Sequence, residues 1–560
     1  MTTKQIAPYG SWKSPITSDL IVAETISLGQ PMLDGDDIYW LEVRPQEQGR
    51  YVIVRRAPDG TIVDVNPSPF SARTRVHEYG GGSYVVADGV VTFANFVDQR
   101  LYRQQLDAQP EALTPEAAWR YADAVVDGQR NRLICIREDH SDPSDQAVNT
   151  VAAVSLETGA TTVLVAGNDF YSSPRLSPDG KRLAWLTWNH PNMPWDGCEL
   201  WVAEIDGVGG VTAPRQVAGG AAESIFQPEW SPDGVLHFVS DRSGWWNLYR
   251  WHAGEVAALC PMEAEFGGPQ WVFGLSTYAF ADGGIVCKYE KDGQSHLALL
   301  DTATATLEPI ELPYTKIYSV KAKRVEAILV GGSPTEPIAL VVLNLSTHEH
   351  EILRRSNNLT IDPGYLATPQ SIEFPTTHGL TSHAIFYPPK NRDFAAPADE
   401  RPPLLVMSHG GPTGATDSSF DAQIQFWTSR GIAVVDVNYG GSTGYGRAYR
   451  ERLNGQWGVV DVDDCTNAAL YLAEQGMVDR ERLAITGGSA GGYTTLCCLT
   501  FKDVFKAGAS HFGISDLEAF LDTHKFESRY LDSLIGPYPE RRDLYQERSP
   551  IHYMDRLSCP

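Results

Sequence analysis

The stretch AITGGSAGGYTTL (484–496) decides the fold of the C-terminal part of the chain. Its centre, Gly487-Gly488-Ser489-Ala490-Gly491, has the pattern G-x-S-x-G and follows RLAIT (482–486), an apolar run typical of a buried strand. The residues after Ser489 favour a helix. A turn between a strand and a helix exposes the serine hydroxyl, and the glycines at 487, 488 and 491 let neighbouring backbone come close. We therefore predict that Ser489 is a catalytic nucleophile.

A second motif offers backbone N–H groups that could stabilise the oxyanion formed when Ser489 attacks a carbonyl. The apolar run LLVMSH (404–409) leads into His409-Gly410-Gly411-Pro412, where small residues leave backbone N–H groups uncovered. The predicted helix after Ser489 points its N-terminal N–H groups at any anion that forms there. The N–H groups of Gly410 and Ala490 are our candidates for an oxyanion hole, with His409 and Gly411 as part of the same loop motif.

Strands alternate with helices over residues 371–560. Short β-branched runs have the character of buried parallel strands, and the segments between them have helical spacing. This alternation predicts a doubly wound sheet of the α/β-hydrolase type. The predicted strands lie within 371–389, 404–409, 432–439, 482–486 and 507–512, and the predicted helices within 417–431, 461–476 and 490–500.

From about residue 30 to 350 the sequence repeats a short β-rich run, a turn with Gly, Asp or Pro, and another β-rich run. The clearest copies are LSPDGKRLAWLTW (176–188) and WSPDGVLHFVSDRSGWWNLYRWHAG (230–254). About seven copies, at roughly 40–50 residues each, match the period of four-stranded β-propeller blades. An array of β-sandwiches is the alternative, but regular Asp-Gly turns and aromatic pairs favour the propeller. The weaker copies lie at 34–56, 90–104, 130–159, 284–305 and 324–347.

Composition narrows the class of protein. The 560 residues carry 45 Lys and Arg against 70 Asp and Glu, a formal charge of −25, which disfavours nucleic acid and anionic membrane surfaces as partners. No apolar run reaches the roughly 18 residues needed to span a bilayer, and we expect a cytoplasmic protein. The eight cysteines form no C-x-x-C pair, which indicates reduced thiols rather than disulfides or a zinc site.

Three further motifs have ordinary structural explanations. THEHE (347–351) has no partner ligands and is typical of a hairpin end. NYGGSTGYG (438–446) lacks the residues of a phosphate-binding loop. The acidic run at Asp461, Asp463 and Asp464 suits the first turn of a helix. The sequence implies no metal and no cofactor.

Several motifs follow one another in an order known from one family. They are YGSWKSPI (9–16), RVHEYGGG (75–82), HGGP (409–412), NYGGSTGYGRAY (438–449), QWGVVDVDD (456–464), GGSAGGYT (487–494), RYLDSLIGPYPE (529–540) and RSPIHY (548–553). With them the chain resembles the prolyl oligopeptidase family of serine peptidases, nearest its bacterial dipeptidyl aminopeptidase and acylaminoacyl-peptidase branch.

The resemblance implies a propeller that caps an α/β-hydrolase domain, Ser489 as nucleophile, and peptide substrates that reach it through a cavity between the domains. It also places HKFESRY (524–530) where the family builds its S1 pocket. Phe526 is therefore a candidate wall for the P1 side chain, and Tyr493 is a second candidate for the substrate pocket.

The groups that would activate Ser489 are not evident. In α/β-hydrolases the acid and then the histidine follow the serine. His511, His524 and His552 follow Ser489, but none stands at the strand ends where the family has its partners. We expect that the triad Asp and His are not present in this chain, that the sheet is incomplete at its C-terminal end, and that the chain is a truncated form of a longer peptidase. Without its general base it should be nearly inactive.

We divide the chain into an N-terminal segment (1–29), a propeller (30–357), a hinge (358–370) and a partial hydrolase domain (371–560). The leading function is a serine peptidase acting on short peptides, with the propeller restricting access. An esterase of the same fold is an alternative, as is a catalytically incomplete, propeller-bearing interaction protein. The sequence leaves three questions open. They are whether the action is that of an exopeptidase, an endopeptidase or an acyl-peptide hydrolase, which P1 residue is preferred, and whether the protein forms a homo-oligomer.

Overall fold

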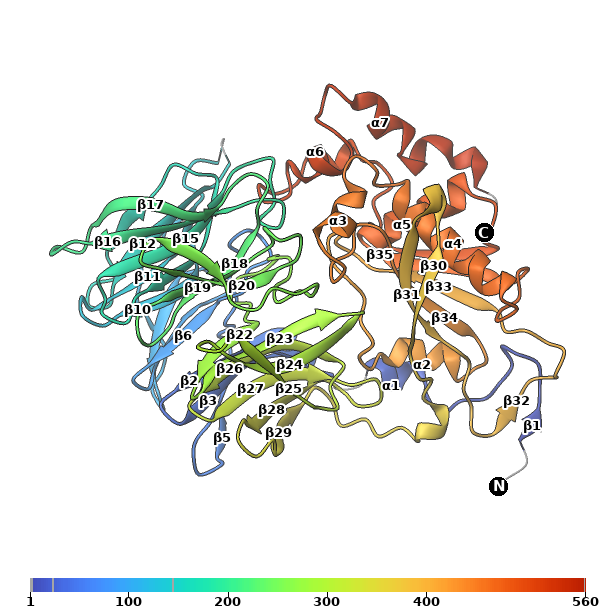
Figure 1. Ribbon diagram of the computed structural model, residues 1–560, viewed down its shortest axis with the longest axis horizontal. Helices are drawn as coiled ribbons and strands as arrows, with labels where there is room; N and C mark the ends of the chain where they lie inside the picture. Colours follow the sequence, from blue (N-terminus) through green and yellow to red (C-terminus); the bar gives the residue numbers. More distant parts are fainter. Residues whose placement is uncertain (1–3, 23–24, 144–145, 558, 560) are drawn as a thin grey trace.

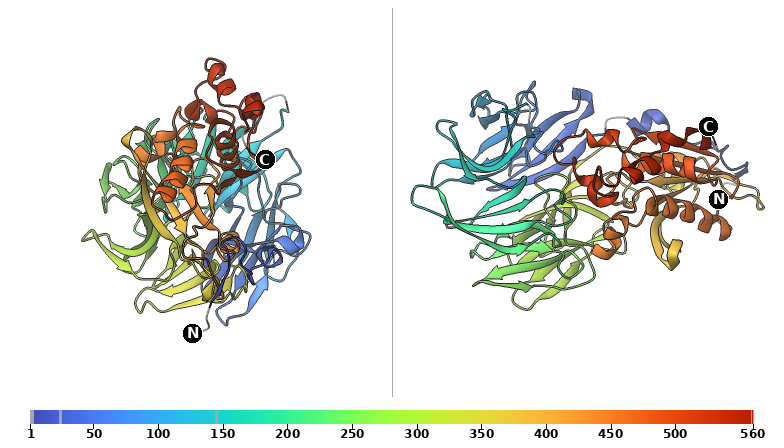
Figure 2. Two further views of the ribbon diagram at one scale, coloured as in Figure 1. Left: turned by 90° about the vertical axis from the view of Figure 1, so that its right-hand side faces the viewer. Right: turned by 90° about the horizontal axis from the view of Figure 1, so that it is seen from above.

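A computed structural model describes residues 4–22, 25–143, 146–557 and 559. Two bodies lie side by side, a β-propeller and an α/β domain (Figure 1). The N-terminal segment crosses to the α/β domain, where β1 (Gln5–Ile6) pairs in parallel with β32 (Phe394–Ala395). The views in Figure 2 show the same two bodies from the side and from above.

The propeller has seven blades among the described residues, each a four-stranded antiparallel sheet, as the repeats predicted. Blades 1 to 3 comprise β2 (Ser27–Asp34), β3 (Asp37–Arg44), β4 (Arg50–Arg56), β5 (Ile62–Asp64); β6 (Tyr84–Ala87), β7 (Val90–Ala94), β8 (Leu101–Gln105), β9 (Glu111–Ala112); and β10 (Trp119–Asp127), β11 (Arg132–Asp139), β12 (Val148–Ser155), β13 (Thr161–Val165). Blades 4 and 5 comprise β14 (Phe170–Leu176), β15 (Arg182–Trp188), β16 (Glu199–Ile205), β17 (Val211–Gly219); and β18 (Ile225–Trp230), β19 (Leu236–Ser240), β20 (Asn247–His252), β21 (Glu255–Ala258). Blades 6 and 7 comprise β22 (Tyr278–Ala281), β23 (Gly284–Lys291), β24 (Gln294–Asp301), β25 (Thr306–Ile310); and β26 (Lys316–Lys323), β27 (Glu326–Gly332), β28 (Ala339–Asn344), β29 (His350–Arg355).

The repeated Ser-Pro-Asp-Gly segments make the tight turns between the first two strands of blades 4 and 5. Gly180 and Gly234 lie in the left-handed region, with φ of 66° and 81°, which glycine adopts without strain. Each glycine N–H donates to the carbonyl oxygen of the serine three residues earlier, at 2.8 Å to Ser177 and 2.9 Å to Ser231. The same local chemistry therefore produces the same hairpin in both blades.

The ring closes where blade 7 packs against blade 1. Trp40 and Val54 of blade 1 share one buried cluster with Ile328 and Leu340 of blade 7. No strand is exchanged between these two sheets as the structure describes them. The closure rests on side-chain packing together with ion pairs such as Arg354 Nε to Glu42 Oε1 at 2.8 Å.

Polar side chains from the innermost strands line a space at the centre of the propeller. Arg175 of β14 pairs with Asp123 of β10 and with Glu229 of β18, both at 3.0 Å, and Lys321 of β26 lines the same space. Buried charges are retained where they are paired in this way. The inner strands therefore carry polar residues at positions that an ordinary buried strand would fill with apolar ones.

The α/β domain is built on a six-stranded sheet in the order β30-β31-β34-β33-β35-β36. The last four strands in this order run parallel to one another. Strand β31 runs antiparallel to both of its neighbours, β30 and β34. The strands are β30 (Gln370–Pro375), β31 (Thr381–Tyr387), β33 (Leu404–Ser408), β34 (Ala433–Asn438), β35 (Leu483–Gly488) and β36 (Ala507–His511).

Helices cover both faces of this sheet, as expected for a doubly wound fold. Val406 and Ile485 belong to the cluster that contains the buried residues of α4 (Val460–Glu474) and α5 (Ala490–Phe501). Leu405 and Met407 face the other way and pack with Ile424 of α2 (Ala422–Thr428). The remaining helices are α1 (Ser18–Val22), α3 (Arg447–Arg450), α6 (Tyr530–Leu534) and α7 (Arg542–Glu547).

The helix predicted over 417–431 is shorter than expected. It begins at Ala422, after Asp421, whose carboxylate accepts a 2.6 Å hydrogen bond from the N–H of Gln423. Asp417 instead accepts a hydrogen bond from the hydroxyl of Tyr318 in the propeller, at 3.2 Å. The segment before the helix therefore helps to dock the two bodies.

No helix within the described ranges is long and apolar enough to cross a membrane.

Candidate active site

Ser489 stands at the sharp turn between β35 and α5, the nucleophile elbow (residues 487–491). Its backbone has φ 55° and ψ −120°, a conformation that non-glycine residues adopt only when the surroundings enforce it. The surroundings do so here: the N–H of Ser489 donates a 3.0 Å hydrogen bond to the carbonyl oxygen of His511, at the end of β36. The serine side chain is exposed.

At two of the elbow glycines there is no room for a side chain. A Cβ at Gly491 would lie 2.0 Å from the carbonyl oxygen of Ser408, and one at Gly487 would lie 2.4 Å from the carbonyl oxygen of Gly491. At Gly488 the nearest atoms to a Cβ would be side-chain atoms of Phe512, at 3.1 Å, and the carbonyl oxygen of His511 is farther away, at 3.8 Å. The close approach of β33, β35 and α5 is therefore what the G-x-S-x-G pattern permits.

Gly410 lies directly beside the nucleophile. A Cβ on Gly410 would be 3.6 Å from Cβ of Ser489 and 3.3 Å from the carbonyl oxygen of Gly488. Ala490 is the first residue of α5, and N–H groups in the first turn of a helix have no intrahelical acceptor. These two predicted donors thus flank one serine, although they come from segments about 80 residues apart in the sequence.

The loop that carries Gly410 is fixed from the side. His409 stacks on Tyr439 with ring centroids 4.3 Å apart, and its Nε2 lies 2.7 Å from the hydroxyl of Ser442. The hydroxyl of Tyr439 donates to the carbonyl oxygen of His409 at 3.0 Å. Desolvation lowers the pKa of His409 to about 4, so its imidazole is neutral at pH 7. Gly411 precedes Pro412 with a φ of 124°.

Sequence reasoning missed Tyr439 and Ser442 as supports of this loop. Both lie in NYGGSTGYG, a segment that carries the family resemblance but to which the sequence assigned no role at the site. One acidic residue of α4 supports the same segment, since Asp464 accepts a 2.7 Å hydrogen bond from the N–H of Gly440. Asp461 instead accepts a 2.6 Å hydrogen bond from the hydroxyl of Thr494 in α5. In the part of the chain that the structure describes, no group of three or more His, Cys, Asp or Glu could hold a metal ion.

Phe526 lies between the two bodies. It is 2% exposed and packs against propeller aromatics, including His77 at 5.2 Å and Trp271 at 6.2 Å between ring centroids. Trp271 also donates from Nε1 to the carbonyl oxygen of Thr413 at 2.7 Å, which links this aromatic cluster to the loop beside Ser489.

Tyr493 is fully buried in the hydrolase core, and its hydroxyl donates to the carbonyl oxygen of Arg548 at 2.9 Å.

The histidines that follow Ser489 have other surroundings. His511 contributes its carbonyl oxygen to the elbow, while Nε2 of His524 lies 3.2 Å from a carboxylate oxygen of Glu527. His552 is exposed. Among the residues that the structure describes, no histidine ring is hydrogen-bonded to the hydroxyl of Ser489.

Several known proteins are similar to this chain in sequence and in fold. A model of the Prolyl oligopeptidase family matches residues 418–560. The structure of a puromycin-hydrolyzing peptidase of Mycobacterium tuberculosis is 43% identical, with a TM-score of 0.95, covering 99% of this chain and 88% of that one. Puromycin hydrolase, solved as a serine-to-alanine mutant complexed with PGG, is 40% identical with a TM-score of 0.94 and the same coverage.

Among curated proteins, dipeptidyl aminopeptidase BIII of Pseudoxanthomonas mexicana is 34% identical over 170 residues, which are 29% of this chain and 25% of that protein. The chain thus spans about a quarter of the length of the curated relatives that it first matches. The motifs around Ser489, the propeller and the likeness over nearly the whole chain to the puromycin-hydrolyzing peptidase together show that this chain belongs to the prolyl oligopeptidase family.

Proposed function

We propose that this chain carries the nucleophile and the oxyanion hole of a serine peptidase that acts on short peptides. The observation that carries the proposal is Ser489 at the elbow between β35 and α5 with Gly410 against it. Similarity to peptidases named for puromycin hydrolysis, one of them complexed with PGG, supports a peptide-like substrate.

The reaction follows from the geometry. The hydroxyl oxygen of Ser489 attacks the peptide carbonyl, and the N–H groups of Gly410 and Ala490 stabilise the tetrahedral oxyanion, each by ~3 kcal/mol. The C–N bond then breaks, the amine leaves with a proton, and water hydrolyses the acyl-enzyme. The propeller beside the site restricts entry to short or unfolded peptides.

We also propose that Phe526 forms one wall of the pocket for the P1 side chain. It is held by aromatic residues of the propeller, and one of them, Trp271, is hydrogen-bonded to Thr413 in the loop of Gly410. Phe526→Leu is then expected to change KM between substrates with large and small P1 side chains. Tyr493→Phe, which alters a buried residue, should change the free energy of unfolding more than substrate preference.

We propose that the described residues by themselves supply no general base to Ser489 and turn substrate over slowly. A serine hydrolase without its base loses on the order of a million-fold in turnover and keeps about a thousand-fold over water. Alanine at His511, His524 or His552 should then change the residual rate less than twofold. A thousand-fold loss from any one of them would identify the base and contradict this proposal.

An esterase would use the same acyl-enzyme. Matched peptide amide and ester substrates separate the two activities: a peptidase hydrolyses both, and hydrolysis of the ester alone would favour the esterase. The Ser489→Ala variant is the control for both reactions.

The eight free cysteines support a cytoplasmic location for the activity.

A further inference from the structure

A cavity of about 230 Å³ lies between the propeller and the loop that carries Gly410. The hydrolase domain contributes backbone and small side chains to it, among them Gly414, Ala415 and Gly444. The propeller contributes three charged side chains, Lys288 and Glu290 of β23 and Lys316 of β26. A charged cluster thus faces a small, partly open cavity whose other walls are backbone, apolar and hydroxyl groups.

The two lysines share a single acceptor. Nζ of Lys288 lies 3.1 Å and Nζ of Lys316 lies 2.7 Å from the same oxygen, Oε1 of Glu290. Both lysine side chains are largely buried, at 8% and 16% exposure. An ammonium group has three N–H donors, so donor capacity remains on both lysines after this contact. The charged groups that line the cavity sum to one positive charge.

Asp417 does not line the cavity, but its charge, like that of Glu290, favours the charged form of both lysines. It accepts hydrogen bonds from the hydroxyl of Tyr318 and from Ser419. Burial alone would raise the pKa of Glu290, but Lys316 and Lys288 outweigh it and lower that pKa to about 2. Burial, together with the neighbouring charge of Lys316, lowers the pKa of Lys288 despite Glu290. An additional anion in the cavity would therefore be favourable for Lys288.

The cavity adjoins the catalytic loop. A Cβ on Gly414 would be 3.3 Å from the carbonyl oxygen of Gly410, the residue beside Ser489. On the opposite wall, a Cβ on Gly444 would be 3.7 Å from Oε2 of Glu290. The N–H of Thr443 donates to the carbonyl oxygen of Gly414 at 2.8 Å, so these two loops lie together between the lysines and the nucleophile region.

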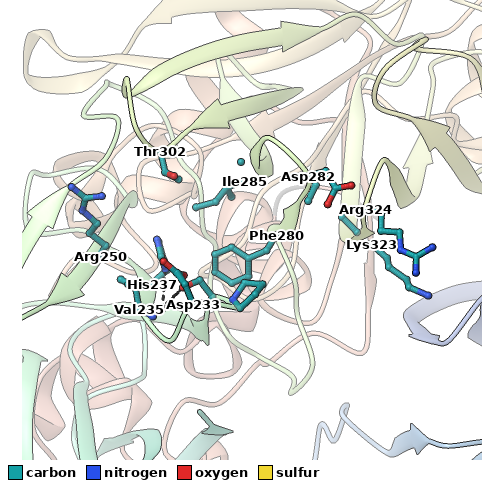
Figure 3. Close-up of a pocket in the computed structure, with 15 residues that line it drawn as sticks. Asp233, Val235, His237, Arg250, Phe280, Asp282, Ile285, Thr302, Lys323 and Arg324 are labelled. Carbon is teal, nitrogen blue, oxygen red and sulfur yellow. Dashed lines mark hydrogen bonds between the residues drawn. The ribbon is translucent and has the colours of Figure 1, made fainter. Parts of the chain in front are cut away.

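A second cavity, on the propeller, has a different character. It measures about 470 Å³ and lies among turns of blades 5, 6 and 7, with His237 edge-on to Phe280 (Figure 3). Its guanidinium groups, Arg250 and Arg324, belong to exposed residues, and Asp233 stands among them. Solvent and salt screen such exposed charges, so they bind anions weakly. Buried donors with spare capacity distinguish the cavity of Lys288 and Lys316.

We propose that the cavity of Lys288 and Lys316 is an anion site that takes the C-terminal carboxylate of a peptide. This inference rests on the proposed peptidase function, which places peptides at the loop of Gly410. A carboxylate accepts hydrogen bonds from both ammonium groups, whereas an N-terminal ammonium offers them no acceptor. At about 230 Å³ the cavity is smaller than the ~300–1,000 Å³ of sites for drug-sized ligands, which suits one terminal residue. The site would favour peptides with a free C-terminus on the leaving-group side.

Binding without turnover tests the proposal. In the Ser489→Ala chain, calorimetry compares the tripeptide Ala-Ala-Gly with its C-terminal amide. The acid is expected to bind about tenfold more tightly or better, as charge-assisted hydrogen bonds provide. Lys288→Met and Lys316→Met should each bring that ratio below about 2 and leave amide binding unchanged. Lys323→Met, at a propeller lysine paired with Asp36, is the matched control and should keep the ratio.

Three results would overturn the proposal. The first is a ratio near 1 in the Ser489→Ala chain itself, a measurement that needs no lysine variant to fold. The second is a ratio retained in both lysine variants. The third is stabilisation against heat by sodium acetate or phosphate that depends on Lys288 while the peptide ratio is near 1, which would assign the site to a free anion. A tenfold ratio in the Ser489→Ala chain, together with a failure of Ser489 to be acylated in the original chain, would support the carboxylate site and contradict only the peptidase.

Discussion

Arg450 of α3 donates a 2.7 Å hydrogen bond from Nη2 to Oδ2 of Asp241 in the propeller, and both side chains are buried. Arg447 donates to the same oxygen, also at 2.7 Å. The guanidinium of Arg450 lies over the ring of Trp246, 4.2 Å from its centroid. Two cations from the hydrolase domain thus converge on one propeller carboxylate at the boundary between the bodies.

Asp241→Asn should weaken the docking of the two bodies. Removing one partner of a buried ion pair leaves an uncompensated charge, which costs about 3–5 kcal/mol. Urea titration followed by tryptophan fluorescence measures the loss, since Trp246 adjoins Arg450. The control is Asp543→Asn, at an exposed pair with Arg541, which should change the free energy of unfolding by less than ~1 kcal/mol. Equal effects of the two variants would contradict the role of Asp241.

Gly491→Ala should disturb the elbow. The added Cβ would meet the carbonyl oxygen of Ser408 at 2.0 Å, so β33 and α5 must separate, at a cost of about 1–3 kcal/mol. We expect at least a hundred-fold slower acylation of Ser489, because a small displacement of reacting groups is costly. Gly207→Ala, where no atom lies within 4 Å of the Cβ position, is the control. Unchanged acylation in the Gly491 variant would show that the elbow tolerates the displacement.

The stability of the fold should depend on the ionisation of Asp436 in β34. Burial raises the pKa of this carboxyl from 3.8 to about 7, and the nearby Asp421 and Asp417 add to the rise, against the hydrogen bond from Thr416. Since the folded-state pKa lies above the unfolded one, the stabilisation is complete below about pH 4 and is lost as pH rises through about 7.

The Asp436→Asn variant isolates this contribution. Between pH 5 and pH 8 the original protein should lose on the order of 3 kcal/mol more in the free energy of unfolding than the variant, which cannot ionise there. Urea titrations at both pH values provide the comparison, with the exposed Asp503→Asn as control. A parallel decline in the original and in the Asp436 variant would contradict the pKa assigned to this group.

The fold was predictable from local chemistry, but not every strand was. Asp-Gly turns and paired β-rich runs located all seven blades, and the strand between 482 and 486 and the helix after Ser489 lie where the pattern predicted them. The predicted copies cover the middle strands of the blades and leave out the outermost strands, such as β9, and the innermost ones. FYSSPRL (β14) carries Arg175, which pairs across the centre of the ring, so its polar residues follow from tertiary contacts that alternation along one strand does not reveal.

The site was predictable only in part for the same reason. G-x-S-x-G and HGGP reveal Ser489 and Gly410 because their small residues serve local backbone geometry, and their catalytic roles stay predictions. Tyr439 and Ser442 act through contacts with His409, about 30 residues away, and no local pattern specifies such a contact. Lys288 and Lys316 lie in different blades and meet only when the propeller forms.

Covalent labelling at Ser489 tests the central claim most directly. The chain is treated with a fluorophosphonate, with and without added imidazole as a diffusible base, and the adduct is located by peptide mass spectrometry. We predict one phosphonyl group on Ser489, faster labelling with imidazole, and no adduct in the Ser489→Ala variant. Labelling at another serine, or equal labelling of the original chain and the variant, would contradict the account.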